Sequence, residues 1–84
     1  MEKHEKLIFQ ILRGTSDANI FFSDLVNLLK HFGFEIRIKG SHHIFRKSSI
    51  EERVNLQKDG NKAKPYQVRQ IRKLIHKYQL GGKG

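Results

Sequence analysis

The apolar residues of this chain recur at helical spacing in three stretches, each next to a residue that typically begins or ends a helix. The first stretch covers residues 3–13 and stops at Gly14. The second follows Ser23, whose hydroxyl can cap a helix N-terminus, and the third begins at Pro65, which suits the first position of a helix. The apolar positions are Leu7, Ile8, Ile11 and Leu12, then Leu25, Leu28, Leu29 and Phe32, then Val68, Ile71, Ile75 and Tyr78. The pattern therefore predicts three amphipathic helices.

Between the second and third helices the hydrophobic period changes to two. Phe34, Ile36 and Ile38 alternate with charged residues, which is typical of a strand with one buried face. The predicted strands are residues 34–39, 42–47 and 50–56, and the polar stretch 57–64 predicts a loop. Helix, helix, three antiparallel strands and helix in this order predict a single α+β domain over residues 1–84, with a three-stranded sheet packed against the helices.

Charge and composition narrow the possible partners. The 84 residues include 17 Lys and Arg against 8 Asp and Glu, a formal net charge of +9. Such an excess favours a polyanionic partner, with nucleic acid ahead of a membrane, although a solvated basic surface without a partner is the alternative. The chain has no cysteine and no apolar run of about 20 residues, and Met1–Lys6 lacks the apolar core of a signal peptide. We therefore expect a cytoplasmic protein that does not enter the membrane.

Candidate chemistry concentrates in the predicted hairpin over residues 39–47, where Gly40 and Ser41 form a turn and two histidines follow. His42 and His43 point to opposite faces of a strand, so they cannot readily chelate one metal ion, and we expect neither metal nor cofactor. The sequence also gives little support for a Ser-His-Asp hydrolase triad, because no acid near Ser41 is identifiable as the group that orients an imidazole. The remaining histidines, His4, His31 and His76, are expected to be ordinary surface residues.

RNA cleavage needs less from the protein, because the 2′-hydroxyl of the substrate is itself the nucleophile. One histidine, which titrates near neutral pH, can accept or donate the proton that moves. Three cations, Lys39, Arg46 and Lys47, would hold the phosphates, and Phe45 would stack on a base. The simpler interpretation, which composition alone favours, is that the histidine pair merely binds phosphate or caps the hairpin.

The length of the turn decides which histidine faces solvent. A two-residue turn pairs Ile38 with His43 and puts His43 and Phe45 on the apolar face of the first strand. A three-residue turn instead puts Ile44 on that face and leaves His43 and Phe45 on the open one, beside Arg37 and Lys39. Both lengths are common. We favour the longer turn, because it gathers His43, Phe45 and the strand cations on one surface.

The segment Gly40-Ser41-His42-His43-Ile44-Phe45-Arg46 resembles the Gly-Ser-x-His segment of the HicA (YcfA-like) toxin family. The likeness covers roughly residues 23–80. It implies a double-stranded-RNA-binding-domain-like fold, a ribosome-independent mRNA interferase of a type II toxin-antitoxin system, and a HicB-like antitoxin that covers the active site. The family's functional histidine falls on His43, whereas His42 occupies a position at which the family tolerates other residues.

Two departures from the family pattern accompany the likeness. The first 20 or so residues have no counterpart in the shortest members, so we expect an N-terminal helical extension over 1–22, a HicA-like core over 23–80 and a frayed tail over 81–84. Many members also carry Pro-x-His where this chain reads Leu56-Gln57-Lys58-Asp59. His43 is therefore the expected general acid/base of a metal-independent endoribonuclease, without an identified partner. The expected RNA contacts are Lys39, Gly40, Ser41, His42, Phe45, Arg46 and Lys47. The alternative function is a non-catalytic RNA-binding module that uses the same basic face.

Overall fold

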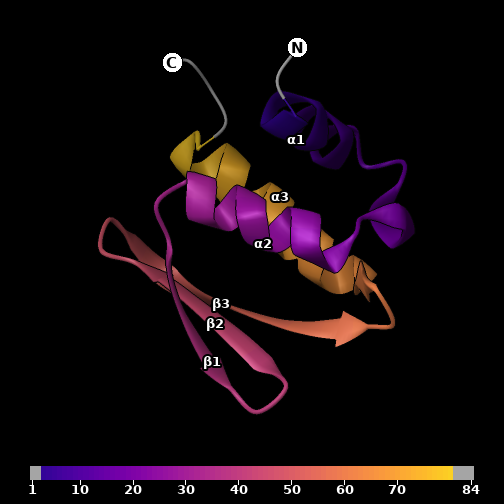
Figure 1. Cartoon of the computed structure of the whole chain (residues 1–84). Helices are drawn as coiled ribbons and strands as arrows, with labels where there is room; N and C mark the ends of the chain where they lie inside the picture. Colours follow the sequence, from indigo (N-terminus) through magenta and orange to yellow (C-terminus); the bar gives the residue numbers. More distant parts are fainter. Residues whose placement is uncertain (1–2, 81–84) are drawn as a thin grey trace.

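The computed structural model describes residues 3–80, which form an α+β fold with all helices on one side of an antiparallel sheet (Figure 1). The helices are α1 (Lys3–Arg13), the short 3-10 helix η1 (Asp17–Asn19), α2 (Phe22–His31) and α3 (Pro65–Tyr78). The strands are β1 (Glu35–Lys39), β2 (His42–Lys47), β3 (Ile50–Asp59) and β4 (Lys62–Ala63). The predicted fold class is confirmed, and the tail predicted over 81–84 lies outside the described residues.

The sheet has four strands in the order β1-β2-β3-β4, one more than the sequence predicted. β3 continues to Asp59, turns through Gly60 at a φ of +67° and returns as β4, so the predicted loop over 57–64 is wrong. The two residues of β4 are held on both sides. They pair with the end of β3, and the Ala63 backbone N–H donates a hydrogen bond to the Ile20 carbonyl at 2.9 Å.

The N-terminus of α2 lies against the hairpin that β3 and β4 form. The helix begins at Phe22 rather than after Ser23, and its N-cap residue is Phe21, which has no side-chain capping bond. The backbone N–H of Phe22 instead donates to the carbonyl of Asn61 at 3.0 Å. One of the N–H groups that a helix start leaves unpaired is therefore satisfied by the β3–β4 turn, which fixes Phe22 relative to β3.

The core lies between the sheet and the helices, and α1 packs on α2 and α3 on the side away from the sheet (Figure 1). The inward side chains include Phe45, Val54 and Leu56 from the sheet, all fully buried. The helices contribute Ile11, Leu25, Leu28, Leu29, Val68 and Ile71. No helix of residues 3–80 covers the opposite face of the sheet, which is open to solvent (Figure 1).

Polar contacts from α3 fix the sheet and the N-terminal helix in place. The Gln67 side-chain amide pairs with the backbone of Gln57, accepting from its N–H at 3.0 Å, and so covers the edge of β3 that β4 leaves unpaired. Arg72 donates to the Ile11 carbonyl at 2.9 Å and pairs with Asp17 at 2.5 Å, which holds the end of α1. Within residues 3–80, no helix is long and apolar enough to cross a membrane.

An ion pair joins the start of β3 to the end of α3. Glu52 accepts hydrogen bonds from Lys77 at 2.8 Å and from the Tyr78 hydroxyl at 2.6 Å. The donated hydrogen bond from Lys77, followed by that from Tyr78, lowers the pKa of Glu52 to about 2, and the same contact raises the pKa of Lys77. Hydrogen bonds to the ionised carboxylate favour its charged form.

Candidate functional site

The hairpin between β1 and β2 has a two-residue turn, so the longer turn favoured from the sequence is wrong. Lys39 pairs with His42 and Ile38 pairs with His43, with Gly40 at a φ of +62° between them. A shift of one residue would exchange every side chain between the two faces. The observed register places Phe45 opposite Val54 in the core rather than Ile44, and burying the larger aromatic surface is the more favourable choice.

This register removes Phe45 from the candidate RNA contacts. Its side chain is fully buried, on the same face as Ile36 and the core of the domain. An RNA base cannot stack on a ring that the helices cover. The predicted stacking role of Phe45 is therefore wrong, and its role in this fold is to anchor the sheet to the helices.

The open face of the sheet carries the cations and the first histidine of the pair. His42 is exposed, and its Nδ1 lies 3.1 Å from Oδ1 of Asn55, so the other ring nitrogen points to solvent. Arg37, Arg46 and Arg53 line one shallow hollow of about 310 Å³ on this face. Strand alternation adds Lys39 to the same face, beside His42. The structure thus groups His42, not His43, with the strand cations.

The other predicted contacts are divided between the turn and the inner face. Gly40 and Ser41 are exposed at the tip of the hairpin, where the Ser41 hydroxyl accepts a hydrogen bond from Gln57 at 3.4 Å. Lys47 pairs with the buried Ile50 at the far end of β2, and its ammonium lies close to the backbone of Gly33. Lys47 is therefore separated from His43 by the length of the strand.

His43 lies on the inner face, at the margin of the core. Its ring is half-buried and meets the ring of Phe22 edge-on, with centroids 4.9 Å apart and an interplanar angle of 79°. Among the described residues, its Nδ1 is the buried side-chain polar atom that has no hydrogen-bond partner. Nε2 is consequently the ring nitrogen that a substrate can reach. An imidazole held in this way presents one proton-transferring atom in a fixed position.

Comparison with known proteins identifies the family of the chain. The family described as the HicA toxin of bacterial toxin-antitoxin matches residues 22–77, from the first residue of α2 almost to the end of α3. The chain belongs to the HicA toxin family. The family predicted from the hairpin segment is thereby confirmed, and with it the assignment of the protein as a toxin of a toxin-antitoxin pair. No curated protein and no solved structure matches the chain significantly.

The structure of this HicA toxin places two lysines, which sequence reasoning did not assign, over the phenylalanine rings at the start of α2. The Nζ atom of Lys58 lies 5.9 Å from the ring centroid of Phe22, the same ring that His43 contacts. The Nζ atom of Lys62 lies 5.8 Å from the ring of Phe21, one residue earlier in the chain. Both lysines lie in the stretch predicted to be a loop. The alternation of Val54 and Leu56, continued by two residues, would have placed Lys58 on the inner face.

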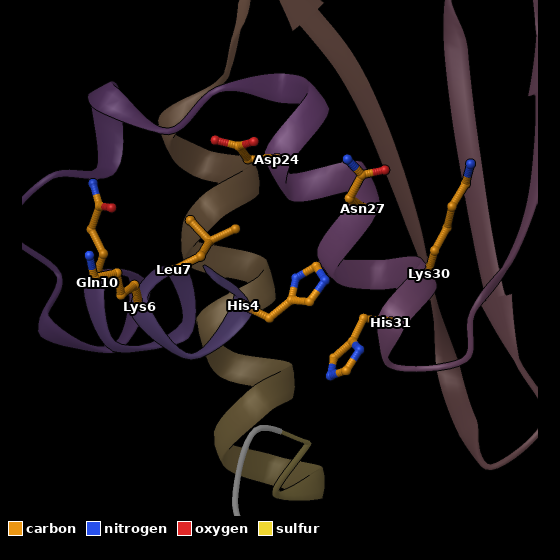
Figure 2. A pocket seen from close by; sticks show the side chains of 8 residues that line it. All are labelled: His4, Lys6, Leu7, Gln10, Asp24, Asn27, Lys30 and His31. Carbon is orange, nitrogen blue, oxygen red and sulfur yellow. The ribbon is translucent and has the colours of Figure 1, made fainter. Parts of the chain in front are cut away.

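A larger hollow of this HicA toxin lies elsewhere, between α1 and α2 (Figure 2). It measures about 590 Å³, and Figure 2 shows His4 and His31 facing each other across the two helices. Their rings are stacked with centroids 4.4 Å apart. No residue predicted for the RNA site lines this hollow, and α1 lies outside the matched residues. Within residues 3–80, no group of three or more His, Cys, Asp or Glu is placed to hold a metal ion.

Proposed function

We propose that this HicA toxin is a metal-independent endoribonuclease that cleaves mRNA, with His43 as the general acid/base. The observation that carries the proposal is the placement of the His43 ring against Phe22, with Nδ1 buried and Nε2 left for the substrate. The family match supports the toxin assignment, and the net charge of +9 supports a nucleic-acid substrate.

In the proposed reaction, the 2′-oxygen of one nucleotide attacks the adjacent phosphorus. Nε2 of His43 takes the 2′-hydroxyl proton, a bond forms between O2′ and phosphorus, and the bond from phosphorus to O5′ breaks. The departing O5′ receives a proton from the imidazolium, which returns the histidine to its starting state. The products are a 2′,3′-cyclic phosphate and a free 5′-hydroxyl, and the reaction requires no cofactor.

The cations of the hairpin would hold the RNA during this reaction. Lys39 and Arg46 lie on the open face of the sheet. There they would neutralise phosphates of an RNA strand that approaches the hairpin tip. Gly40 and Ser41 form the exposed tip between that face and His43, and His42 supplies a further polar contact. Lys47, at the far end of β2, would contact RNA only at a distance from the cleavage site.

A HicB-like antitoxin is the proposed protein partner, and the cytoplasm is the proposed location. An inhibitor that acts directly would cover His43 and place acidic side chains against the basic rim. Such a contact would block the same approach that RNA needs. Inhibition by a partner bound only to α1, with His43 still accessible, would contradict direct occlusion.

A non-catalytic RNA-binding module is the second candidate function. It is favoured by the open face itself, where Arg37, Arg46 and Arg53 line one hollow together with Glu35. Such a face can bind phosphates without cutting the chain, because positioning cations alone moves no proton.

The experiment that separates the two functions uses the purified chain with one single-stranded RNA and its fully 2′-O-methylated copy, both in EDTA. We expect the RNA to be cut into products with 2′,3′-cyclic phosphate ends, and the methylated copy to be bound but not cut, because its nucleophile is blocked. Binding of both strands without any cleavage would favour the RNA-binding module. Cleavage of the methylated copy would exclude the proposed reaction.

A further inference from the structure

His43 and Lys58 come from neighbouring strands and contact the same aromatic ring. The Phe22 ring meets the His43 ring at a centroid distance of 4.9 Å and lies 5.9 Å from Nζ of Lys58. Phe22 is 3% exposed, and its backbone is tied to the β3–β4 turn by the hydrogen bond to Asn61. One buried ring therefore lies beside both an imidazole and an ammonium group.

The strand register shows why the two side chains share one face. His43 pairs directly with Leu56 on β3, and Lys58 follows Leu56 by two residues, so it lies on the same side of the sheet. Diagonal neighbours of this kind are about 7–8 Å apart at their Cα atoms, a separation that a long side chain can bridge. Lys58 is exposed, so its ammonium group is accessible from solvent.

Among the residues that the strand pairing places next to His43 on this face, Lys58 is the one with a charged side chain. The directly paired residues are Ile38 on β1 and Leu56 on β3, both apolar. The arginines of the open face extend from the opposite side of the sheet and cannot reach the same phosphate from their strands. A cation beside the imidazole matters for the proposed reaction, because negative charge accumulates on the phosphate oxygens in the transition state.

We propose that Lys58 stabilises the scissile phosphate in the transition state of cleavage at His43, and that Phe22 positions both side chains. The proposal rests on the endoribonuclease function proposed above. It assigns to Lys58 a charge-stabilising role that leaves proton transfer to His43. The ammonium group is a compact point charge with three donors, which suits contact with a phosphate oxygen that changes its position during the reaction.

The test compares Lys58→Gln with Lys62→Gln, because both lysines lie over a phenylalanine ring at the start of α2. Each variant loses one positive charge from the same hairpin. We expect Lys58→Gln to lower the cleavage rate at saturating RNA by about 10²-fold, the typical effect of removing one transition-state donor. Lys62→Gln should retain a rate close to that of the parent. Lys58→Arg should restore a substantial part of the rate, since it keeps the positive charge.

Affinity for a 2′-O-methylated RNA, measured in parallel, separates this role from simple binding. We expect the two Gln variants to bind this uncleavable strand about equally well, since each loses one cation. Equal rates for the parent and Lys58→Gln, or equal losses in Lys58→Gln and Lys62→Gln, would overturn the role of Lys58 while leaving the endoribonuclease function standing. A parent chain that cuts no RNA would overturn both.

Discussion

The two adjacent histidines of this HicA toxin occupy opposite environments. His42 is exposed on the open face, with Nδ1 next to Asn55 and with Arg53 nearby. His43 is half-buried on the inner face, with Nδ1 enclosed and an aromatic ring against its edge. The first is placed where phosphates can bind, whereas the second is held rigidly by the core. In the proposed reaction, RNA binding and proton transfer therefore take place on different sides of one strand.

This division depends on the burial of Phe45, two residues after His43. We expect Phe45→Ala to lower the free energy of unfolding by about 3–5 kcal/mol, the usual cost of a large cavity in a core. Because domains of this size are only marginally stable, that loss would leave much of the chain unfolded. Ile44→Ala, on the open face, is the matched control and should cost much less. Equal losses in urea denaturation would show that the register places Ile44 inward instead.

In the proposed reaction, Phe22 positions the catalytic groups of the inner face, since its ring lies beside both His43 and Lys58. Phe22→Leu keeps an apolar side chain in the core but removes the ring that His43 and Lys58 contact. We expect the cleavage rate at saturating RNA to fall by about tenfold to a hundredfold, because small misplacements of reacting groups are costly. Thermal unfolding should show a folded protein. An unchanged rate would mean that the ring has no positioning role.

The open face should act on binding through its charge. Arg37→Gln removes one cation from this face, and we expect RNA affinity to fall severalfold at low salt. If Arg37 neutralises one phosphate, the slope of log affinity against log salt should become shallower by about 0.7. Filter binding of an uncleavable RNA between low and moderate salt measures both effects. A slope that does not change would remove Arg37 from the RNA contacts.

The smallest expected effect concerns the Glu52 end of the inner face, which lies away from His43. The pKa of Glu52 is lowered from an ordinary 4.5 to about 2 in the folded chain, chiefly by Lys77. Its contribution to stability is therefore present above pH 4.5 and is lost as the pH falls toward 2. Glu52→Gln should lower the melting temperature slightly at pH 7 and leave it nearly equal to the parent's near pH 2. A difference that persists at low pH would contradict this origin.

The sequence predicted the elements with strong periodicity and missed those that depend on distant contacts. The stripes of α1, α2 and α3 and the alternation of β1 are local signals, and their elements are present. β4 has two residues, and it is held by Ile20 and by β3, which no local pattern encodes. Likewise, the turn at Gly40 permits two lengths, and only the packing of Phe45 against the helices selects one.

The sequence predicted several residues of the candidate site but not how they are arranged in space. The Gly-Ser-x-His segment located the hairpin and both histidines, but the face of each followed from the turn length. Lys58 could not be assigned to the site, because its proximity to His43 requires β3 to extend past Leu56 and Phe22 to lie against both residues. A strand that continues through polar residues gives a weak sequence signal.

The most direct test of the division between the two faces is single-turnover cleavage of one RNA by His43→Ala and His42→Ala, each at a saturating concentration of protein. Loss of a general acid/base typically lowers the rate by ~10²–10⁴. We expect a loss of this size in His43→Ala with RNA affinity nearly retained, and a much smaller loss of rate in His42→Ala. A larger loss in His42→Ala than in His43→Ala would place proton transfer on the open face and contradict the account.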